Sequence, residues 1–263
     1  MTNGIMDEKY LDIDGLQNAR DIGGMKTKDN RIIKRKKFIR SACLDSISDK
    51  GIRTLKNDYH LGRIYDLRSL AELEELPDKK IDGIQYIHLE VLKADMSNPN
   101  VPLDSKGFRV PYSTDMMFKN YQEYAVGKDA IKCYRQFFND LVNDDVCILF
   151  HCRSGKDRTG ILALLIEYIL GVDIEDIHND YLLINKLKKN EIDSYVKKAE
   201  EITKNPYRLS LMRMAGGTSL ELLNQFYLAI NNEYGDMDNY LLKALDIDKD
   251  KRNLLKDKYT ENI

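Results

Sequence analysis

The sequence has no tryptophan, few prolines and only four cysteines, none of them in a Cys-x-x-Cys pair. Structural zinc sites depend on closely spaced cysteine pairs, and disulfide frameworks are typical of small, cysteine-rich exported domains. The sequence therefore predicts neither feature. Cys43, Cys133 and Cys147 are expected to be small buried side chains, whereas Cys152 stands at the start of a polar loop.

An excess of charge of one sign is also missing. The 41 basic and 43 acidic side chains give a net charge of −2. Because proteins that bind nucleic acid carry a basic excess to neutralise phosphates, we expect no nucleic-acid partner. The short basic run at residues 34–37 is interpreted as a solvated face within a hairpin.

Long apolar runs are absent as well. The longest, residues 161–170, contains Glu167 and is too short to cross a bilayer. The first residues, MTNGIMDEKYLDIDG, are acidic where a signal peptide needs a basic and then an apolar segment. We therefore expect no transmembrane segment, no secretory signal and a cytoplasmic location, with unconventional export and the oligomeric state left open.

No segment rich in proline, glycine and serine separates two domains. Strand and helix patterns alternate instead, which favours a single α/β domain over residues 1–263. Residues 92–117 are interpreted as a loop insertion. Residues 188–217 form a polar helical pattern, interrupted at Pro206, which we interpret as a helical lid.

Capping residues and apolar periodicity place the individual elements. A helix that begins after Ser48 precedes a strand at residues 61–65, which brings Asp66 and Arg68 to its C-terminal end. The other predicted elements are strands at 85–91 and 146–151, helices at 118–143 with a break at Gly127 and at 159–170 up to Gly171, and a wholly helical C-terminal third with helix starts at Asp173, at Thr218 with Glu221, and at Asp236.

Histidines and tyrosines are scattered. The histidines outside the central loop are too far apart in sequence to predict a metal site. Tyrosines at helical spacing are interpreted as half-buried core, although those near the insertion could line the mouth of a site. These residues are His60, His88 and His178, and Tyr112, Tyr121 and Tyr124.

One stretch carries the chemistry: HCRSGKDRTG, residues 151–160, lies between a buried strand and an apolar helix. Cys152 and Arg158 have Cys-x5-Arg spacing, but Cys147 and Arg153 share that spacing within the strand. Context separates the two pairs. The amides of a loop at a helix N-terminus converge on one point and favour an anion there.

The residues of this loop fit a bound phosphate. Gly155 allows the backbone conformation that converging amides need, and Arg158 offers a planar fork for two oxygens. Cys152, in the same electropositive cup, is expected to be a thiolate aimed at phosphorus. The expected phosphate-binding residues are Arg153, Ser154, Gly155, Lys156, Asp157 and Arg158.

The motif His-Cys-x-x-Gly-Lys-Asp-Arg-Thr-Gly resembles the signature of the cysteine-dependent protein-tyrosine phosphatase superfamily, and more narrowly that of its bacterial tyrosine and lipid phosphatases. Three further motifs occur in that family's order: Asn-Ala-Arg-Asp-Ile-Gly-Gly from Asn18, Arg40-Ser41, and Asp-Leu-Arg-Ser from Asp66 with Glu72 following. The resemblance implies a three-layer fold with a small, mostly parallel central sheet flanked by helices. It implies neither a metal nor a cofactor.

The resemblance also implies roles for the loop residues. Cys152 would attack phosphorus and form a cysteinyl-phosphate, while Arg158 and the loop amides stabilise the phosphoryl oxygens. Thr159 would donate its hydroxyl to the sulfur as the sulfur departs. His151 is expected to shape the loop through hydrogen bonds rather than to transfer protons.

The general acid departs from the common pattern, because a chain without tryptophan has no Trp-Pro-Asp loop. Asp157 is the first candidate, since myotubularin-like phosphatases also have a carboxylate within the phosphate loop. The alternative for Asp157 is a brace paired with Arg20 or Arg68. Asp66 is the second candidate, although a buried ion pair with Arg68 is favoured for it.

Two loop cations bear on the substrate. Arg153 and Lys156 resemble the two lysines in the loop of tensin-related phosphoinositide phosphatases. The resemblance predicts a phosphorylated protein as substrate, phosphotyrosine first, with phosphoinositides and phosphoserine or phosphothreonine also accepted. The alternative is that Lys156 only balances Asp157.

Two other classes of function use a similar loop. A catalytically inactive phosphate-binding module is the first, but such modules usually lose the cysteine, the arginine or the loop acid. A rhodanese-like sulfurtransferase is the second, and the arginine and threonine at the end of the loop, with His151 before the cysteine, favour the phosphatase. The sequence therefore predicts a metal-independent phosphomonoesterase.

Overall fold

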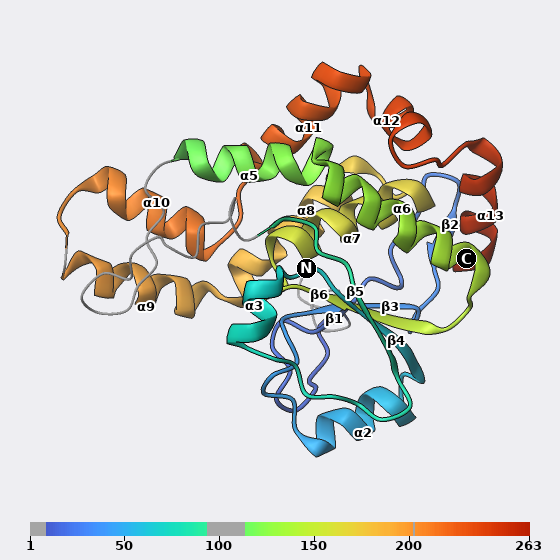
Figure 1. Cartoon of the computed structure of the whole chain (residues 1–263), viewed down its shortest axis with the longest axis horizontal. Coiled ribbons are helices and arrows are strands. Elements are labelled where there is room, and N and C mark those ends of the chain that lie inside the picture. The colour runs from blue at the N-terminus through green and yellow to red at the C-terminus, as the bar shows by residue number, and fades with distance from the viewer. Residues whose placement is uncertain (1–8, 94–113, 202) are drawn as a thin grey trace.

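The computed structural model describes residues 9–93, 114–201 and 203–263, and a five-stranded sheet with helices on both faces lies at its centre (Figure 1). Neighbouring strands follow the order β1-β3-β6-β4-β5. Only β1 and β3 pair antiparallel, and the other neighbours are parallel. The mixed α/β fold with a mostly parallel sheet is therefore confirmed. The strands are β1 (Arg20–Asp21), β3 (Phe38–Ser41), β4 (Leu61–Asp66), β5 (Gln85–His88) and β6 (Cys147–His151).

The central strand β6 is buried along its whole length, as its continuous apolar run predicts. Successive side chains point to opposite faces, so Ile148 and Phe150 join one apolar cluster and Cys147 and Leu149 join the other. Helix α2 (Asp49–Asn57) contributes Leu55 to the second cluster. The first, larger cluster lies under the longer helices.

Parallel strands bring their carboxyl ends to one edge of the sheet. The register pairs Ser41 with His151 and Asp66 with His151, so the last residues of β3, β6 and β4 lie side by side. The loop after β6 leaves the sheet at this edge and leads into α7 (Asp157–Leu170). This helix is apolar nearly all round and largely buried, and Gly171 ends it with a φ of +92°.

Further helices pack around this core. The predicted break at Gly127 and the predicted caps Ser48, Asp173 and Asp236 are confirmed. The helices are α3 (Leu70–Glu75), α5 (Thr114–Val126), α6 (Lys128–Asn143), α8 (Ile174–Leu187), α9 (Lys189–Glu200), α10 (Pro206–Gly216), α11 (Leu220–Tyr234), α12 (Met237–Lys243) and α13 (Lys249–Tyr259).

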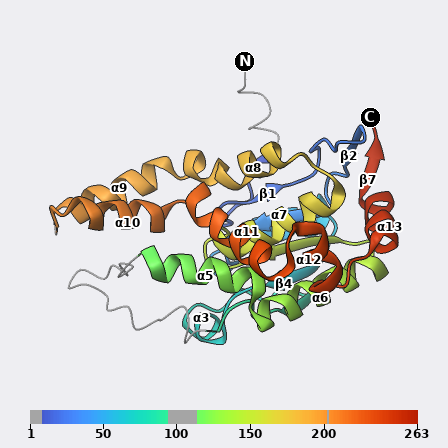
Figure 2. The same ribbon diagram turned by 90° about the horizontal axis from the view of Figure 1, so that it is seen from above.

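Helices α9 and α10 lie side by side and project from the body as an arm (Figures 1 and 2). The predicted interruption at Pro206 is confirmed, because α9 ends at Glu200 and Pro206 begins α10. At this position the missing amide hydrogen of proline costs nothing, and Asn205 caps the helix. The pair corresponds to the segment that the sequence predicted as a lid.

Several predicted boundaries were wrong. Residues 114–117, assigned to the insertion, form the first turn of α5, and 94–113 lie outside the described residues. Strand β5 ends at His88, before Val91. Ser219 rather than Thr218 caps α11, because the Thr218 hydroxyl bonds the carbonyl of Tyr181.

The basic run at residues 34–37 lies in the second arm of an antiparallel hairpin, as predicted, because residues 20–27 pair with residues 31–40 on both sides of the run. The run connects β2 (Arg31–Ile33) to β3, and β2 also pairs with β7 (Thr260–Asn262) in a separate two-stranded sheet. The strand β7 corrects the prediction that the C-terminal third is wholly helical. Its pairing partner lies far away in sequence, so no local pattern indicates it. Among the described residues, no helix is long and apolar enough to span a membrane.

Replacement of Phe137 by alanine is expected to lower the free energy of unfolding by about 3–5 kcal/mol, because it opens a cavity in the larger cluster. The Phe137 ring is fully buried and lies 4.8 Å from the Tyr65 ring. Urea denaturation measures the change. Leu242→Ala, at a side chain that is 51% exposed, is the control and should change stability by less than about 0.5 kcal/mol. A loss at Phe137 no larger than the control's would contradict the packing described.

Candidate active site

Cys152 follows the last residue of β6 directly and is 2% exposed. The loop from Cys152 to Lys156 then turns into α7, whose first residue is Asp157. Helix α7 has 14 residues, so its N-terminal amides and its dipole favour an anion at this end. The sequence placed the start of this helix two residues later, at Thr159.

Gly155 allows the loop to turn. Its φ is +66°, a conformation that side chains other than glycine rarely adopt. A Cβ atom there would lie 2.3 Å from the carbonyl oxygen of Ser41 at the end of β3. The neighbouring strand therefore excludes any larger residue at this position.

Hydrogen bonds from other elements hold the loop carbonyls. Asn18 Nδ2 donates to the carbonyls of Ser154 (3.2 Å) and Gly155 (2.9 Å), and Arg40 Nη2 donates to the latter (3.3 Å). The backbone amide of Cys43 donates to the carbonyl of Arg153 (3.2 Å).

The direction of these bonds determines where the loop amides point. In a planar trans peptide the C=O and the following N–H point in opposite directions. Because the carbonyls of residues 153–155 face Asn18, Arg40 and Cys43, the amides of residues 154–156 point to the opposite side of the loop. Adjacent donors on one side of a loop are suited to bind an anion.

Arg158 lies at the first turn of α7 and forms a two-pronged ion pair with Glu72 of α3 (2.5 and 2.7 Å). Glu72 also accepts the backbone amide of Ser69 and so completes the capping box of α3. Burial alone would raise the pKa of Glu72, but hydrogen bonding and charge attraction from Arg158 lower it to about 2. The carboxylate therefore fixes the plane of the arginine fork.

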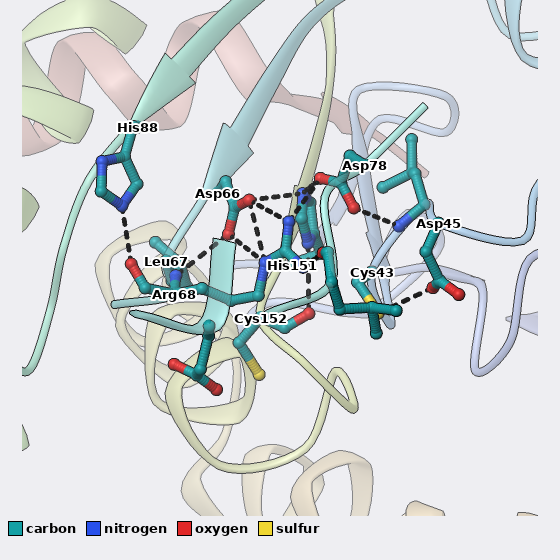
Figure 3. Close-up of polar contacts among 12 residues, drawn as sticks. Cys43, Asp45, Asp66, Leu67, Arg68, Asp78, His88, His151 and Cys152 are labelled. Carbon is teal, nitrogen blue, oxygen red and sulfur yellow. Dashed lines mark hydrogen bonds and ion pairs between the residues drawn. The ribbon is translucent and has the colours of Figure 1, made fainter. Parts of the chain in front are cut away.

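Behind Cys152 lies a buried cluster built around Arg68 (Figure 3). Its guanidinium binds Asp66 (2.6 Å) and Asp78 (2.9 Å), and Tyr86 donates to Asp66 Oδ2 (2.5 Å). Burial would raise the pKa of Asp66, but the charge of His151 and the hydrogen bonds from Arg68 lower it below its ordinary value. Asp66 is thus an ionised, fully engaged carboxylate.

His151 belongs to the same cluster. Its Nε2 lies 3.1 Å from Asp78 Oδ2, and its Nδ1 lies 3.1 Å from the carbonyl of Cys152. Asp66, Asp78 and His151 are the one group in the described part of the chain with metal-ligand potential. The Arg68 guanidinium already supplies a cation to both carboxylates, so we expect no metal there.

Asp157 accepts a hydrogen bond from the Tyr121 hydroxyl of α5 at Oδ1 (2.5 Å), and Lys156 Nζ lies 3.5 Å from its Oδ2. The predicted brace with Arg20 or Arg68 was wrong. Arg68 is bound by the cluster behind Cys152. Arg20 and Arg40 are buried beside Asp180 of α8, with N–O distances of 3.5 and 2.8 Å.

The two additional loop cations are both bound by the protein. Arg153 forms a two-pronged pair with Glu75 at the end of α3 (2.7 and 3.1 Å) and is partly exposed. Lys156 Nζ donates to the carbonyl of Ala215 in α10. A cavity of about 330 Å³ lies beside the loop, lined by Ser154 and Lys156 together with residues of α8, α9 and α10.

The structure thus brings together all the predicted loop residues, but not Asp66, which lies behind the loop. The Thr159 hydroxyl is buried and has no hydrogen-bond partner within the described ranges. Tyr121 and Tyr124 are both buried, and Tyr112 lies outside the described residues.

Sequence reasoning missed the residues that support the loop. Asn18, Arg40 and Glu72 lay within the motifs that carried the family resemblance, and their presence there was the available signal. Asp180 and Tyr181 had no such signal, because neither lies in a recognised motif and their partners are distant in sequence.

Comparison with known proteins identifies the family. The sequence profile described as "Tyrosine phosphatase family" matches residues 11–261, so the chain belongs to this family. The chain is also similar to a protein of Cupriavidus necator described as a putative tyrosine-protein phosphatase. The two are 29% identical over 258 residues, which cover 90% of this chain and 85% of the relative.

The ion pair between Glu72 and Arg158 predicts a pH-dependent contribution to stability. The folded-state pKa of Glu72, about 2, lies below its ordinary value of 4.5. The contribution is therefore present above about pH 4.5 and is lost as the pH falls toward 2. We expect the stability difference between the wild type and Glu72→Gln, measured by denaturant unfolding, to shrink over that range. Glu75→Gln, at an exposed pair, is the control and should cost less than about 1 kcal/mol throughout. A difference for Glu72→Gln that does not change with pH would contradict this assignment.

Asn18→Asp is expected to weaken the anion cup. The substitution keeps the shape and tolerates the φ of +54° at this position, but it turns a donor that faces two carbonyls into an oxygen. Tungstate binding measured by calorimetry should weaken about tenfold or more, because a buried carbonyl without a partner costs about 1–3 kcal/mol. The control is Asn143→Asp on the surface of α6. Equal affinities in the two variants would show that Asn18 does not orient the loop.

Proposed function

We propose that this member of the tyrosine phosphatase family hydrolyses phosphate monoesters through a cysteinyl-phosphate formed on Cys152. The observation that carries the proposal is the orientation of the loop. The carbonyls of residues 153–155 are bound on one side of the loop, so the amides of residues 154–156 face the other side, with Arg158 at the adjoining helix turn. A nucleophile beneath a set of preorganised donors is the arrangement that phosphoryl transfer needs.

In the first step Cys152 Sγ attacks phosphorus, the S–P bond forms and the P–O ester bond breaks. The leaving oxygen takes the bonding electrons and a proton from a general acid. In the second step water attacks phosphorus and gives a proton to the carboxylate that acted as the acid, while the S–P bond breaks and the sulfur keeps the electrons. Arg158 and the loop amides stabilise the phosphoryl oxygens in both steps, and the buried Thr159 hydroxyl is available to donate to the departing sulfur.

Asp157 is the general acid in this proposal. Arg68 and Tyr86 bind both oxygens of Asp66, and the lowered pKa of Asp66 opposes its protonation. Asp157 lies at the front of the loop with a side chain that is 28% exposed, so a substrate oxygen can reach it. Asp66 then acts as part of the support behind His151.

Phosphotyrosine is the substrate class that we propose first, with phosphoinositides and phosphoserine or phosphothreonine after it. The charge argument for phosphoinositides rested on Arg153 and Lys156. Each has a partner in the protein, so a second phosphate would have to compete with Glu75 or the carbonyl of Ala215 for these cations. The cavity beside the loop offers room for the body of a substrate.

We also propose that residues 1–263 act as one phosphatase domain and that the α9–α10 arm serves as its lid. The bond from Lys156 to the carbonyl of Ala215 supports this, since it joins the arm to the phosphate loop. The cavity beside the loop is bounded by the same arm. A cytoplasmic location remains part of the proposal.

The test is phosphate release from a phosphotyrosyl peptide, a phosphoseryl peptide and a set of phosphoinositides, in the presence of a chelator. Cys152→Ser should abolish release, because a serine hydroxyl is a far weaker nucleophile than a thiolate. Cys147→Ala is the matched control, since Cys147 and Arg153 share the same spacing, and it should retain activity.

Three other results would overturn the proposal. No release from any ester, with tungstate still bound, would indicate a phosphate-binding module. A persulfide on Cys152 after incubation with thiosulfate, without phosphate release, would indicate a sulfurtransferase. Release that persists in Cys152→Ser would exclude the cysteinyl-phosphate.

A further inference from the structure

Two buried tyrosine hydroxyls lie in line behind the loop carboxylate. The Tyr181 hydroxyl of α8 is 2.5 Å from the Tyr121 hydroxyl of α5, which is 2.5 Å from Asp157 Oδ1. Tyr121 is 3% exposed and Tyr181 is 2% exposed. The mechanism described above uses neither hydroxyl.

The direction of the protons in this line is fixed. Each phenol has one proton, and a carboxylate oxygen only accepts, so the proton of Tyr121 goes to Asp157 and that of Tyr181 goes to Tyr121. Burial, together with the charge of Asp157, raises the pKa of both tyrosines well above the ordinary value. Both hydroxyls therefore keep their protons and remain donors.

The hydrogen bonds from these two tyrosines make the two oxygens of Asp157 different, because only Oδ1 accepts from Tyr121. Because Oδ1 already accepts from Tyr121, Oδ2 is the oxygen left to carry a proton. Lys156 Nζ lies 3.5 Å from Oδ2, and an ammonium group has no lone pair with which to take that proton. Without Tyr121 the partly exposed carboxyl group could rotate. A displacement of about 1 Å at a reacting group can cost roughly 100-fold in rate.

Packing holds the line of hydroxyls rigidly. The Tyr121 ring lies 5.4 Å from the Tyr124 ring, edge to face. The Tyr181 ring faces Gly160 of α7, where a Cβ atom would come within 3.1 Å of it, and its carbonyl accepts from Thr218. Two helices that are distant in sequence thus fix one carboxylate from the side away from solvent.

We propose that Tyr121 and Tyr181 are positioning residues that orient Asp157 so that Oδ2 carries the proton for the leaving oxygen. This inference rests on the proposed function. As the P–O bond breaks, Oδ2 gives its proton to the leaving oxygen, and the carboxylate that remains keeps the hydrogen bond from Tyr121. In the second step Oδ2 takes a proton from the attacking water. Neither tyrosine changes its protonation state.

The test compares kcat/KM, which reports the steps up to formation of the cysteinyl-phosphate, for two esters whose leaving groups need the proton to different degrees. Phenyl phosphate releases a weakly acidic phenol, and p-nitrophenyl phosphate releases a much more acidic one. Tyr121→Phe should lower kcat/KM for phenyl phosphate about tenfold more than for p-nitrophenyl phosphate, since general acid catalysis contributes about 100-fold or more. Tyr181→Phe should change the ratio in the same direction by a smaller factor. Thermal unfolding of each variant confirms that it is folded.

Two further variants make the result specific. Tyr240→Phe is the matched control, because it removes a buried hydroxyl that donates to the carbonyl of Ala125 on the same helix as Tyr121. It should leave the ratio between the two esters unchanged. Asp157→Asn is the reference for complete loss of the proton donor, and it should show the largest dependence on the leaving group.

The outcomes separate this inference from the proposed function. One outcome is that Asp157→Asn changes the ratio while Tyr121→Phe and Tyr181→Phe lower kcat/KM for both esters equally or leave it unchanged. In that case the positioning role is wrong and the phosphatase mechanism stands. If Asp157→Asn leaves the ratio unchanged, the donor assignment and the inference both fail. An enzyme inactive on both esters would overturn the proposed function itself.

Discussion

The hydrogen bonds on the carbonyls of residues 153–155 are the constraint on which the site depends. A peptide unit has one donor and one acceptor on opposite sides, so the loop can present amides to an anion only if something else binds its carbonyls. Asn18, Arg40 and the amide of Cys43 do this from elements that come before the loop in sequence. Residues from the N-terminal third of the chain therefore hold the loop at residues 152–156 in its conformation.

Helix α8 connects the two sides of this arrangement through consecutive residues. Asp180 pairs with Arg20 and Arg40 and so supports the clamp on Gly155. Tyr181 supports Asp157 through Tyr121. A small rotation of α8 would move both supports at once, so the position of this one helix affects both the loop carbonyls and Asp157.

The sequence predicted the parts of the site that are local. The strand, the polar loop and the apolar helix are adjacent in the chain, so their pattern revealed the cup, and the resemblance supplied the class of fold. Long-range contacts were the parts that local patterns could not reveal. The pairing of β2 with β7 joins chain segments more than 200 residues apart, and Asp157 found its partner in α5 rather than in Arg20 or Arg68. Predicted helix boundaries were wrong where a tertiary contact outweighed local preference. The Thr218 hydroxyl donates to the carbonyl of Tyr181, and Ser219 caps the helix instead.

Arg153 and Lys156 both have partners within the protein, and in the proposed function a substrate phosphate would compete with these partners. Under the proposed function, a substrate with one phosphate leaves both internal contacts in place, whereas a second phosphate competes with Glu75 or the carbonyl of Ala215 for a cation. The affinity for extra phosphates is then a difference between two interactions. The pair between Arg153 and Glu75 is exposed, so dissolved salt weakens it, but the same salt also screens an incoming phosphate. Under the proposed function, discrimination between singly and multiply phosphorylated substrates therefore depends on ionic strength as well as on the fold.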